Sequence, residues 1–219
     1  MTFVNTQKMN TSEKFDQAVS KLGLIAILRG VKPDEVVEIG HALYRQGYRI
    51  LEVPLNSPDP YTSIERLVTN MPEDTVSGAG TVVSPDMAER ATAAGAQIVV
   101  CPDMNPGVAE VLNERDAVYC PGVATPSEAF AALDNGATAI KLFPAEMLTP
   151  PVVKAMHAVL PPETRTFPVG GIDSSNMSAY LQAGATGFGI GSSLYKSGRT
   201  IADLSQRAAS LAEAFRMAK

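Results

Sequence analysis

The chain of 219 residues is 45% apolar and 19% charged, a composition typical of a globular protein and unlike that of a disordered one. Its formal net charge of −5 provides no basic surface for nucleic acid or an anionic membrane, and no apolar run approaches the roughly 20 residues of a membrane-spanning helix. Residues 1–12 are polar and lack the apolar core of a secretory signal, so we expect a cytoplasmic protein with neither nucleic-acid nor membrane partners.

Strand-like apolar runs alternate with helical patterns along the chain, after a leading helix at about residues 12–22. The predicted strands are residues 24–28, 50–55, 75–79, 97–101, 117–120, 139–143, 166–169 and 186–190. Ser84-Pro85 and Thr125-Pro126 each combine an N-cap hydroxyl with a proline at the first helical position. Residues 1–11 read as a flexible extension, and no linker divides the remainder, residues 12–219.

The alternation of strands and helices predicts a parallel sheet with helices outside it. Glycines precede every second strand at spacings of 48, 41 and 48 residues, at positions 47, 95, 136 and 184. This weak repeat of two βα units favours a closed barrel. We therefore predict a single (β/α)8 TIM barrel with a leading N-terminal helix. A doubly wound sheet is the alternative, but the glycine-rich run 187–192 lies in the last unit and has the wrong spacing for a dinucleotide loop.

Lys141 is the most informative residue, because it lies within the apolar run 139–143. A lysine is rarely fully buried unless it is paired or used chemically. In water about 0.04% of the amine is neutral at pH 7, and an apolar strand raises that fraction by disfavouring the charge. A neutral amine attacks carbonyl groups and forms Schiff bases. The alternative is a lysine at a strand end whose ammonium reaches solvent.

Two further charged residues lie near the carboxyl ends of predicted apolar strands. Arg29 follows the run 24–28, and Glu52 lies among the aliphatic residues of 50–55. In a barrel the carboxyl ends of the strands meet at the rim that carries the chemistry, so Arg29, Glu52 and Lys141 would converge there. The alternative is that Arg29 and Glu52 form a purely structural ion pair.

Glycine-rich segments follow the seventh and eighth predicted strands. They are Val169-Gly170-Gly171 and Gly189-Ile190-Gly191-Ser192. Exposed backbone N–H groups after these two strands commonly bind phosphate in barrels. We therefore expect Gly170, Gly171, Gly191 and Ser192 to bind a phosphate, the alternative being that the glycines only turn the chain. After the third strand, the Thr81 hydroxyl is a candidate for holding a carboxylate or carbonyl oxygen.

The cysteines and histidines predict neither a metal site nor a disulfide. Cys101 and Cys120 end apolar runs without a CxxC motif, as reduced thiols of a cytoplasmic protein do. His41 and His157 fall on helical patterns far apart in the sequence. We expect no metal and no other cofactor.

Seven segments, in order, carry a family resemblance: Leu-Ile-Ala-Ile-Leu-Arg-Gly (24–30), Glu-Val-Pro-Leu-Asn-Ser-Pro (52–58), Gly-Ala-Gly-Thr-Val (78–82), Cys-Pro-Gly (120–122), Ile-Lys-Leu-Phe-Pro (140–144), Val-Gly-Gly (169–171) and Gly-Ser-Ser-Leu-Tyr (191–195). Together they resemble the class I aldolases of 2-keto-3-deoxy-6-phosphosugar acids. The resemblance implies a homotrimer that cleaves such an acid to pyruvate and glyceraldehyde 3-phosphate. It also implies that Lys141 is the Schiff-base nucleophile, Glu52 the general acid and base, and Arg29 a partner of the substrate carboxylate.

Within that family the chain resembles the members that act on the galactonate epimer. Gluconate-type members carry Thr-Leu-Arg-Thr after the glutamate, where this chain has residues 54–57, and threonine where it has Val169. The missing arginine leaves carboxylate binding to Arg29 and Thr81, and Val169 would approach the C4 hydroxyl. We therefore expect cleavage of 2-dehydro-3-deoxy-6-phosphogalactonate. The alternatives are the gluconate epimer, 4-hydroxy-2-oxoglutarate, a phosphosugar isomerase or epimerase, and a non-catalytic sugar-phosphate-binding barrel.

Overall fold

The computed structural model describes residues 9–219, in which strands and helices alternate after a leading helix. The helices are α1 (Thr11–Lys21), α2 (Val36–Arg45), α3 (Pro60–Asn70), α4 (Pro85–Ala93), α5 (Pro106–Asn113), α6 (Pro126–Asp134), α7 (Pro150–His157), α8 (Met177–Gln182) and α9 (Ile201–Ala218). The strands are β1 (Leu24–Ile27), β2 (Ile50–Pro54), β3 (Val76–Gly80), β4 (Ile98–Val100), β5 (Val118–Cys120), β6 (Gly122–Val123), β7 (Ile140–Leu142), β8 (Thr166–Pro168) and β9 (Phe188–Ile190).

The predicted elements agree closely with these bounds. Each predicted strand has a counterpart whose ends differ by at most two residues. The Thr125 and Glu128 side chains form the expected capping box of α6, and the Ser84 hydroxyl caps α4. The leading helix begins at Thr11 with Asn10 as its N-cap, so it starts one residue earlier than expected. The remainder of the predicted extension, residues 1–8, lies outside the described residues.

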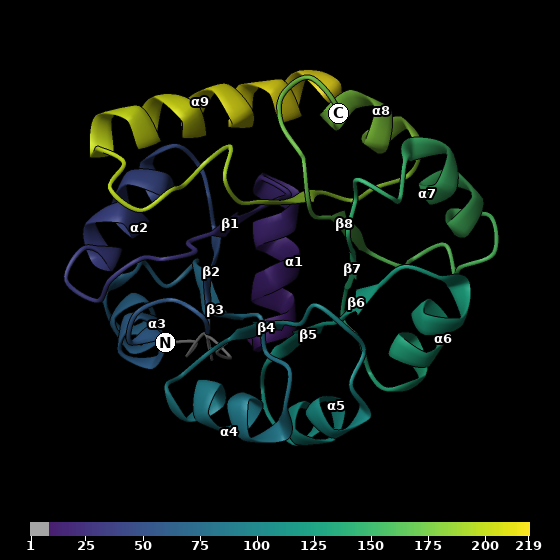
Figure 1. The fold of residues 1–219 in the computed structure, drawn as a ribbon, viewed down its shortest axis with the longest axis horizontal. Coiled ribbons are helices and arrows are strands. Elements are labelled where there is room, and N and C mark those ends of the chain that lie inside the picture. Colours follow the sequence, from purple (N-terminus) through teal and green to yellow (C-terminus); the bar gives the residue numbers. More distant parts are fainter. Residues whose placement is uncertain (1–8) are drawn as a thin grey trace, which may run out of the picture.

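The strands form parallel sheets that curl around a common axis, with helices α2 to α9 outside them (Figure 1). A six-stranded sheet has the order β5-β4-β3-β2-β1-β9, and a three-stranded sheet has the order β6-β7-β8. The predicted parallel α/β fold is confirmed. The complete (β/α)8 barrel is not confirmed, because the strands are divided between these two sheets. One division falls between β5 and β6, at Pro121, which has no N–H to donate.

Backbone contacts nevertheless cross both junctions between the two sheets. At the first junction the Thr138 N–H donates to the Tyr119 carbonyl over 3.0 Å. At the second, the Thr186 N–H donates to the Thr166 carbonyl over 2.9 Å, and Val169 and Gly189 form an isolated parallel bridge. The two sheets are therefore neighbours at both of their edges.

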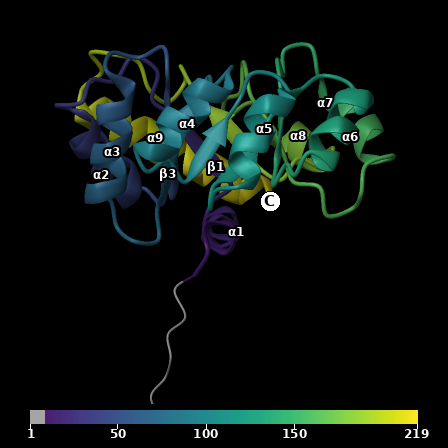
Figure 2. The ribbon, with the colours of Figure 1, turned by 90° about the horizontal axis from the view of Figure 1, so that it is seen from below.

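Helix α1 closes the amino-terminal side of the strands (Figures 1 and 2). Its Phe15 packs on Phe167 with ring centroids 6.0 Å apart, within an inner apolar cluster that includes Ile25, Ile50, Val76, Ile98, Val118 and Ala139. Side chains alternate between the two faces of a strand, so residues two positions further along point to the same interior. Two positions after Ile50, Ala139 and Phe167 come Glu52, Lys141 and Val169, respectively. The fold thus places those three side chains in the layer next to the apolar cluster.

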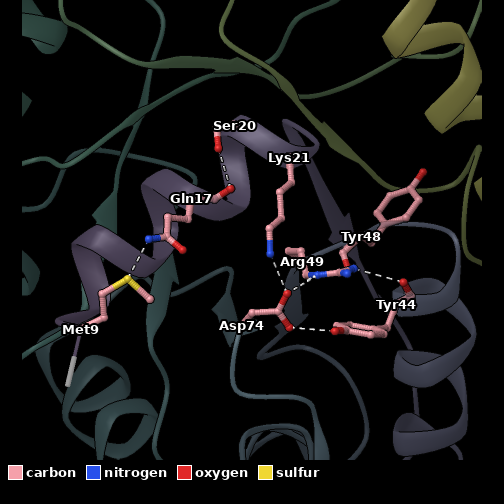
Figure 3. A network of polar contacts seen from close by, with 8 residues as sticks. All are labelled: Met9, Gln17, Ser20, Lys21, Tyr44, Tyr48, Arg49 and Asp74. Atoms are coloured by element: carbon pink, nitrogen blue, oxygen red, sulfur yellow. Dashed lines mark hydrogen bonds and ion pairs between the residues drawn. The ribbon is translucent and has the colours of Figure 1, made fainter. Parts of the chain in front are cut away.

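A polar network anchors α1 to the elements around it (Figure 3). The Asp74 carboxylate accepts hydrogen bonds from Lys21 Nζ, Arg49 Nε and Tyr44 Oη at 2.9, 2.8 and 2.9 Å. Burial raises the pKa of Asp74, but these hydrogen bonds outweigh burial and lower the pKa to about 2. Asp74 therefore remains charged at neutral pH. No helix within residues 9–219 is both long enough and apolar enough to cross a membrane.

Candidate active site

Glu52 is a buried carboxylate on β2 with only 3% of its surface exposed. Burial raises its pKa to about 7, although the positive charges of Lys141 and Arg29 act in the opposite direction. Its Oε2 atom has no hydrogen-bond partner among the described residues. A group with this pKa exchanges protons near neutrality, as a general acid and base must.

Lys141, on β7, is 8% exposed, and its Nζ lies 4.3 Å from the centroid of the Phe143 ring. Burial lowers its pKa, and the neighbouring Glu52 charge raises it. Because each of the two groups shifts the pKa of the other, the structure brings Lys141 and Glu52 into one electrostatic site. A buried amine with a lowered pKa has more of the neutral form that adds to a carbonyl group.

Arg29 and Thr81 lie side by side at the carboxyl ends of β1 and β3. Arg29 Nη2 donates to Thr81 Oγ1 over 3.4 Å, and Arg29 Nη1 donates to Asn56 Oδ1 over 2.5 Å. Thr81 has a φ of 58°, in the left-handed region that β-branched residues rarely adopt. Such strain is often found at functional sites. In the sequence Asn56 indicates only that an arginine is missing, and its contact with Arg29 becomes visible in the fold.

The glycine-rich segments line a cavity of about 780 Å³. Val169, Arg29 and the four expected phosphate-binding residues, Gly170, Gly171, Gly191 and Ser192, all contribute to its wall. Glu52 and Lys141 are buried and do not line this cavity. Thr81 does not line the cavity either, but it contacts Arg29, which does.

Polar side chains hold the two glycine loops in place. Asn176 Nδ2 donates to the Gly171 carbonyl over 2.8 Å, and Ser193 Oγ donates to the Ile172 carbonyl over 2.8 Å. Gly170 and Gly171 have φ values of 113° and 60°, which a residue with a side chain adopts only with backbone strain. The loops thus present backbone close to the cavity.

Several charged residues of this cavity were missed from the sequence. The Glu146 side chain lies against both Gly170 and Gly171, where an added Cβ would contact it. Lys196, Arg199 and Arg207 also line the wall. Glu146 follows Lys141 by only five residues, but no sequence pattern indicates that its side chain turns toward the paired glycines.

The cysteines lie near the two buried charges but are poor nucleophiles. Both thiols are free and buried, and burial raises the pKa of Cys120 to about 12 and that of Cys101 further. At neutral pH they are protonated. Within residues 9–219, no three His, Cys, Asp or Glu side chains are grouped so that they could hold a metal ion.

A comparison with protein families decides the class of the protein. The model of the KDPG and KHG aldolases matches residues 15–208. This chain belongs to that aldolase family. The aldolase is therefore a carbon–carbon lyase, and the resemblance to class I aldolases found in its motifs is confirmed.

Individual relatives agree with the family match. The aldolase is 43% identical over 185 residues to the "probable 2-dehydro-3-deoxy-6-phosphogalactonate aldolase" of Rhizobium meliloti, covering 84% of this chain and 87% of that one. It is 39% identical over 199 residues to the 2-dehydro-3-deoxy-6-phosphogalactonate aldolase of Escherichia coli, covering 91% and 97%. A solved structure described as native KDPGal superposes with a TM-score of 0.88 at 39% identity, covering 90% of this chain and 96% of that one.

Proposed function

We propose that this aldolase cleaves 2-dehydro-3-deoxy-6-phosphogalactonate to pyruvate and glyceraldehyde 3-phosphate through a Schiff base on Lys141. The observation that carries the proposal is the pairing of a buried lysine of lowered pKa with a buried glutamate whose pKa is about 7. The names of the relatives from Rhizobium meliloti and Escherichia coli support the galactonate substrate.

The bond-breaking step uses the two buried groups in sequence. The Lys141 amine adds to the C2 ketone, and loss of water leaves a protonated imine that accepts electrons. Glu52 removes the proton of the C4 hydroxyl, the C3–C4 bond breaks, and its electron pair moves into the imine to form an enamine. Glyceraldehyde 3-phosphate leaves. Glu52 then returns a proton to C3, and water hydrolyses the resulting imine to release pyruvate.

The remaining site residues bind the two charged ends of the substrate. Arg29, oriented by Thr81, pairs with the carboxylate next to the reacting carbonyl. The backbone N–H groups of the glycine loops and the Ser192 hydroxyl bind the phosphate at the other end. Val169 shares the interior face with Lys141 and lines the cavity, so it faces the carbons between the two ends.

We also propose a closed eight-stranded barrel and a homotrimer. The hydrogen bonds across both sheet junctions support the barrel. The trimer rests on the resemblance to the aldolase family alone. Light scattering coupled to size-exclusion chromatography tests it, since a homotrimer of the 23.1 kDa chain has a mass about three times as large.

Borohydride reduction in the presence of pyruvate tests the Schiff base. We expect an irreversible mass gain that peptide mapping locates on Lys141. Lys141→Ala should abolish both this adduct and cleavage, whereas Lys154→Ala, a matched change on α7, should affect neither. Glu52→Gln should still form the adduct while cleavage falls by roughly 10²–10⁴. A wild-type protein that cleaves the substrate without forming an adduct would overturn the mechanism.

The substrate is tested by assaying the galactonate and gluconate epimers and 4-hydroxy-2-oxoglutarate side by side. We expect the highest kcat/KM for the galactonate epimer. A higher value for either of the other two acids would overturn the substrate assignment but leave the Schiff-base mechanism in place.

A further inference from the structure

Two neighbouring rim loops are joined by side-chain hydrogen bonds at Arg29 and Gly30. Arg29 Nη1 donates to Asn56 Oδ1 over 2.5 Å, and the Gly30 N–H donates to Ser57 Oγ over 3.0 Å. Ser57 is 8% exposed, so the acceptor of the second bond is buried. Asn56 and Arg29 are both exposed, so the first bond lies at the surface. The segment after β2 therefore sets the direction of the side chain after β1.

Arg29 differs electrostatically from the other arginines of the cavity. Arg199 and Arg207 each form an ion pair with Asp203 at 2.9 Å. None of the ion pairs found within residues 9–219 includes Arg29. Its two side-chain partners, Asn56 and Thr81, are neutral acceptors. Arg29 is therefore held in direction by neutral groups, while the Glu52 charge acts on it only from beyond ion-pair distance.

A neutral acceptor suits a side chain that must bind a carboxylate. A guanidinium has five N–H donors, and two of them are used by Asn56 and Thr81. The others remain for a two-point contact with an anion, for which the planar group is well shaped. A carboxylate in place of the Asn56 amide would accept the same hydrogen bond but would also compensate the charge.

We propose that Asn56 is a positioning residue, which holds the Arg29 guanidinium toward the substrate carboxylate through a neutral amide oxygen. The inference rests on the proposed function and adds to it a residue that acts through Arg29. It follows that loss of Asn56 weakens the binding of every ligand that has the 2-keto-carboxylate group, with or without a phosphate.

The first test compares Asn56→Ala with the wild type on two ligands. We expect KM for the phosphorylated acid, and the pyruvate concentration needed for half-maximal borohydride trapping, to rise together by about tenfold, as for a lost hydrogen bond to a charged group. The kcat should change by less than about threefold, because the bond is made before and after substrate binds. Asn70→Ala, at the exposed end of α3, is the matched control and should change neither ligand constant. A rise confined to the phosphorylated acid would overturn the proposal.

The second test is a double-mutant cycle with Arg29→Ala. If Asn56 acts through Arg29, Asn56→Ala should have no further effect on KM once Arg29 has been removed. If the two substitutions raised KM independently, so that the KM increase of the double variant equalled the product of the two single increases, the positioning role would be overturned. Trapping of pyruvate on Lys141 in the wild type is independent of this cycle, so failure of the inference is distinguishable from failure of the proposed function.

The third test uses charge. Asn56→Asp keeps an oxygen acceptor at the same distance but adds a negative charge beside Arg29. We expect it to raise both ligand constants more than Asn56→Ala does, although it preserves the loop contact. Binding by Asn56→Asp that equals the wild type would overturn the argument that a neutral acceptor is required.

Discussion

The carboxyl group of Glu52 lies against Gly80 on the neighbouring strand β3, in the space that any larger residue would fill with its Cβ. Glu52 itself is opposite Gly78 in the sheet register, so its side chain leans toward the carboxyl end of the strands. The segment Gly78-Ala79-Gly80 therefore does more than end a strand. Its last glycine provides the space that the proposed acid and base occupies.

Replacing Gly80 tests that relationship. In Gly80→Ala the new methyl group would overlap the Glu52 carboxyl group, so we expect cleavage to fall by at least about tenfold and stability by about 1–3 kcal/mol. In a Glu52→Ala background the same change should cost much less stability, since the overlapping group is gone. Urea unfolding of the four proteins measures this. Equal costs in both backgrounds would show that the carboxyl group does not occupy this space.

The raised pKa of Glu52 predicts how stability depends on pH. The folded-state pKa of about 7 exceeds the ordinary 4.5, so between these values the folded protein binds more protons than the unfolded chain. The contribution of Glu52 to the free energy of unfolding therefore falls as pH rises from about 4.5 to 7. Glu52→Gln removes this fall and should gain stability relative to the wild type across that window, reaching about 1–3 kcal/mol at pH 7.

Unfolding in urea at a series of pH values from 4 to 8 checks the prediction. The difference between Glu52→Gln and the wild type should be smallest below pH 4.5 and should level off above pH 7. The matched control Glu213→Gln, on α9, should show no such trend. A difference that is constant with pH would mean that Glu52 titrates in the folded protein as it does in the unfolded chain.

The phosphate site is tested by adding a negative charge at Ser192, which lines the cavity beside Gly191. Ser192→Asp should raise KM for the phosphorylated acid at least about tenfold through like-charge repulsion. Half-maximal trapping of pyruvate, which has no phosphate, should change little. Ser210→Asp on α9 outside the cavity wall provides the control. Equal effects on both ligands would place the phosphate elsewhere.

Val169 predicts the preference between epimers. It is 8% exposed and lines the cavity directly before the paired glycines. Valine and threonine have similar shapes, but only threonine can bond a hydroxyl, and an unpaired buried hydroxyl is unfavourable. Val169→Thr should therefore shift the ratio of kcat/KM toward the gluconate epimer by about tenfold. Val152→Thr, on the exposed side of α7, should leave the ratio unchanged, and an unchanged ratio in Val169→Thr would refute the assignment.

Much of the fold could be predicted because its signals are local. The strands could be predicted from short apolar runs in the sequence. Capping residues such as Thr125 bind N–H groups only three residues away. The charged residues at the rim could also be predicted, because they come at the ends of strands and parallel strands place their carboxyl ends on the same side. Lys141 stood out because a charge within an apolar strand contradicts its surroundings. The sequence by itself thus determined the order of elements, the aldolase resemblance and the candidate catalytic pair.

Only the tertiary structure decided how side chains from distant loops meet. The contact of Arg29 with Asn56 spans 27 residues, and Glu146 reaches the paired glycines from another loop. Neither contact has a sequence signal, because side-chain direction in a loop depends on the packing of its neighbours rather than on periodicity. The space at Gly80 and the pKa of Glu52 likewise arise from burial between strands, a property of the assembled sheet. The sequence therefore identified the groups that can react, and the folded chain determined their surroundings.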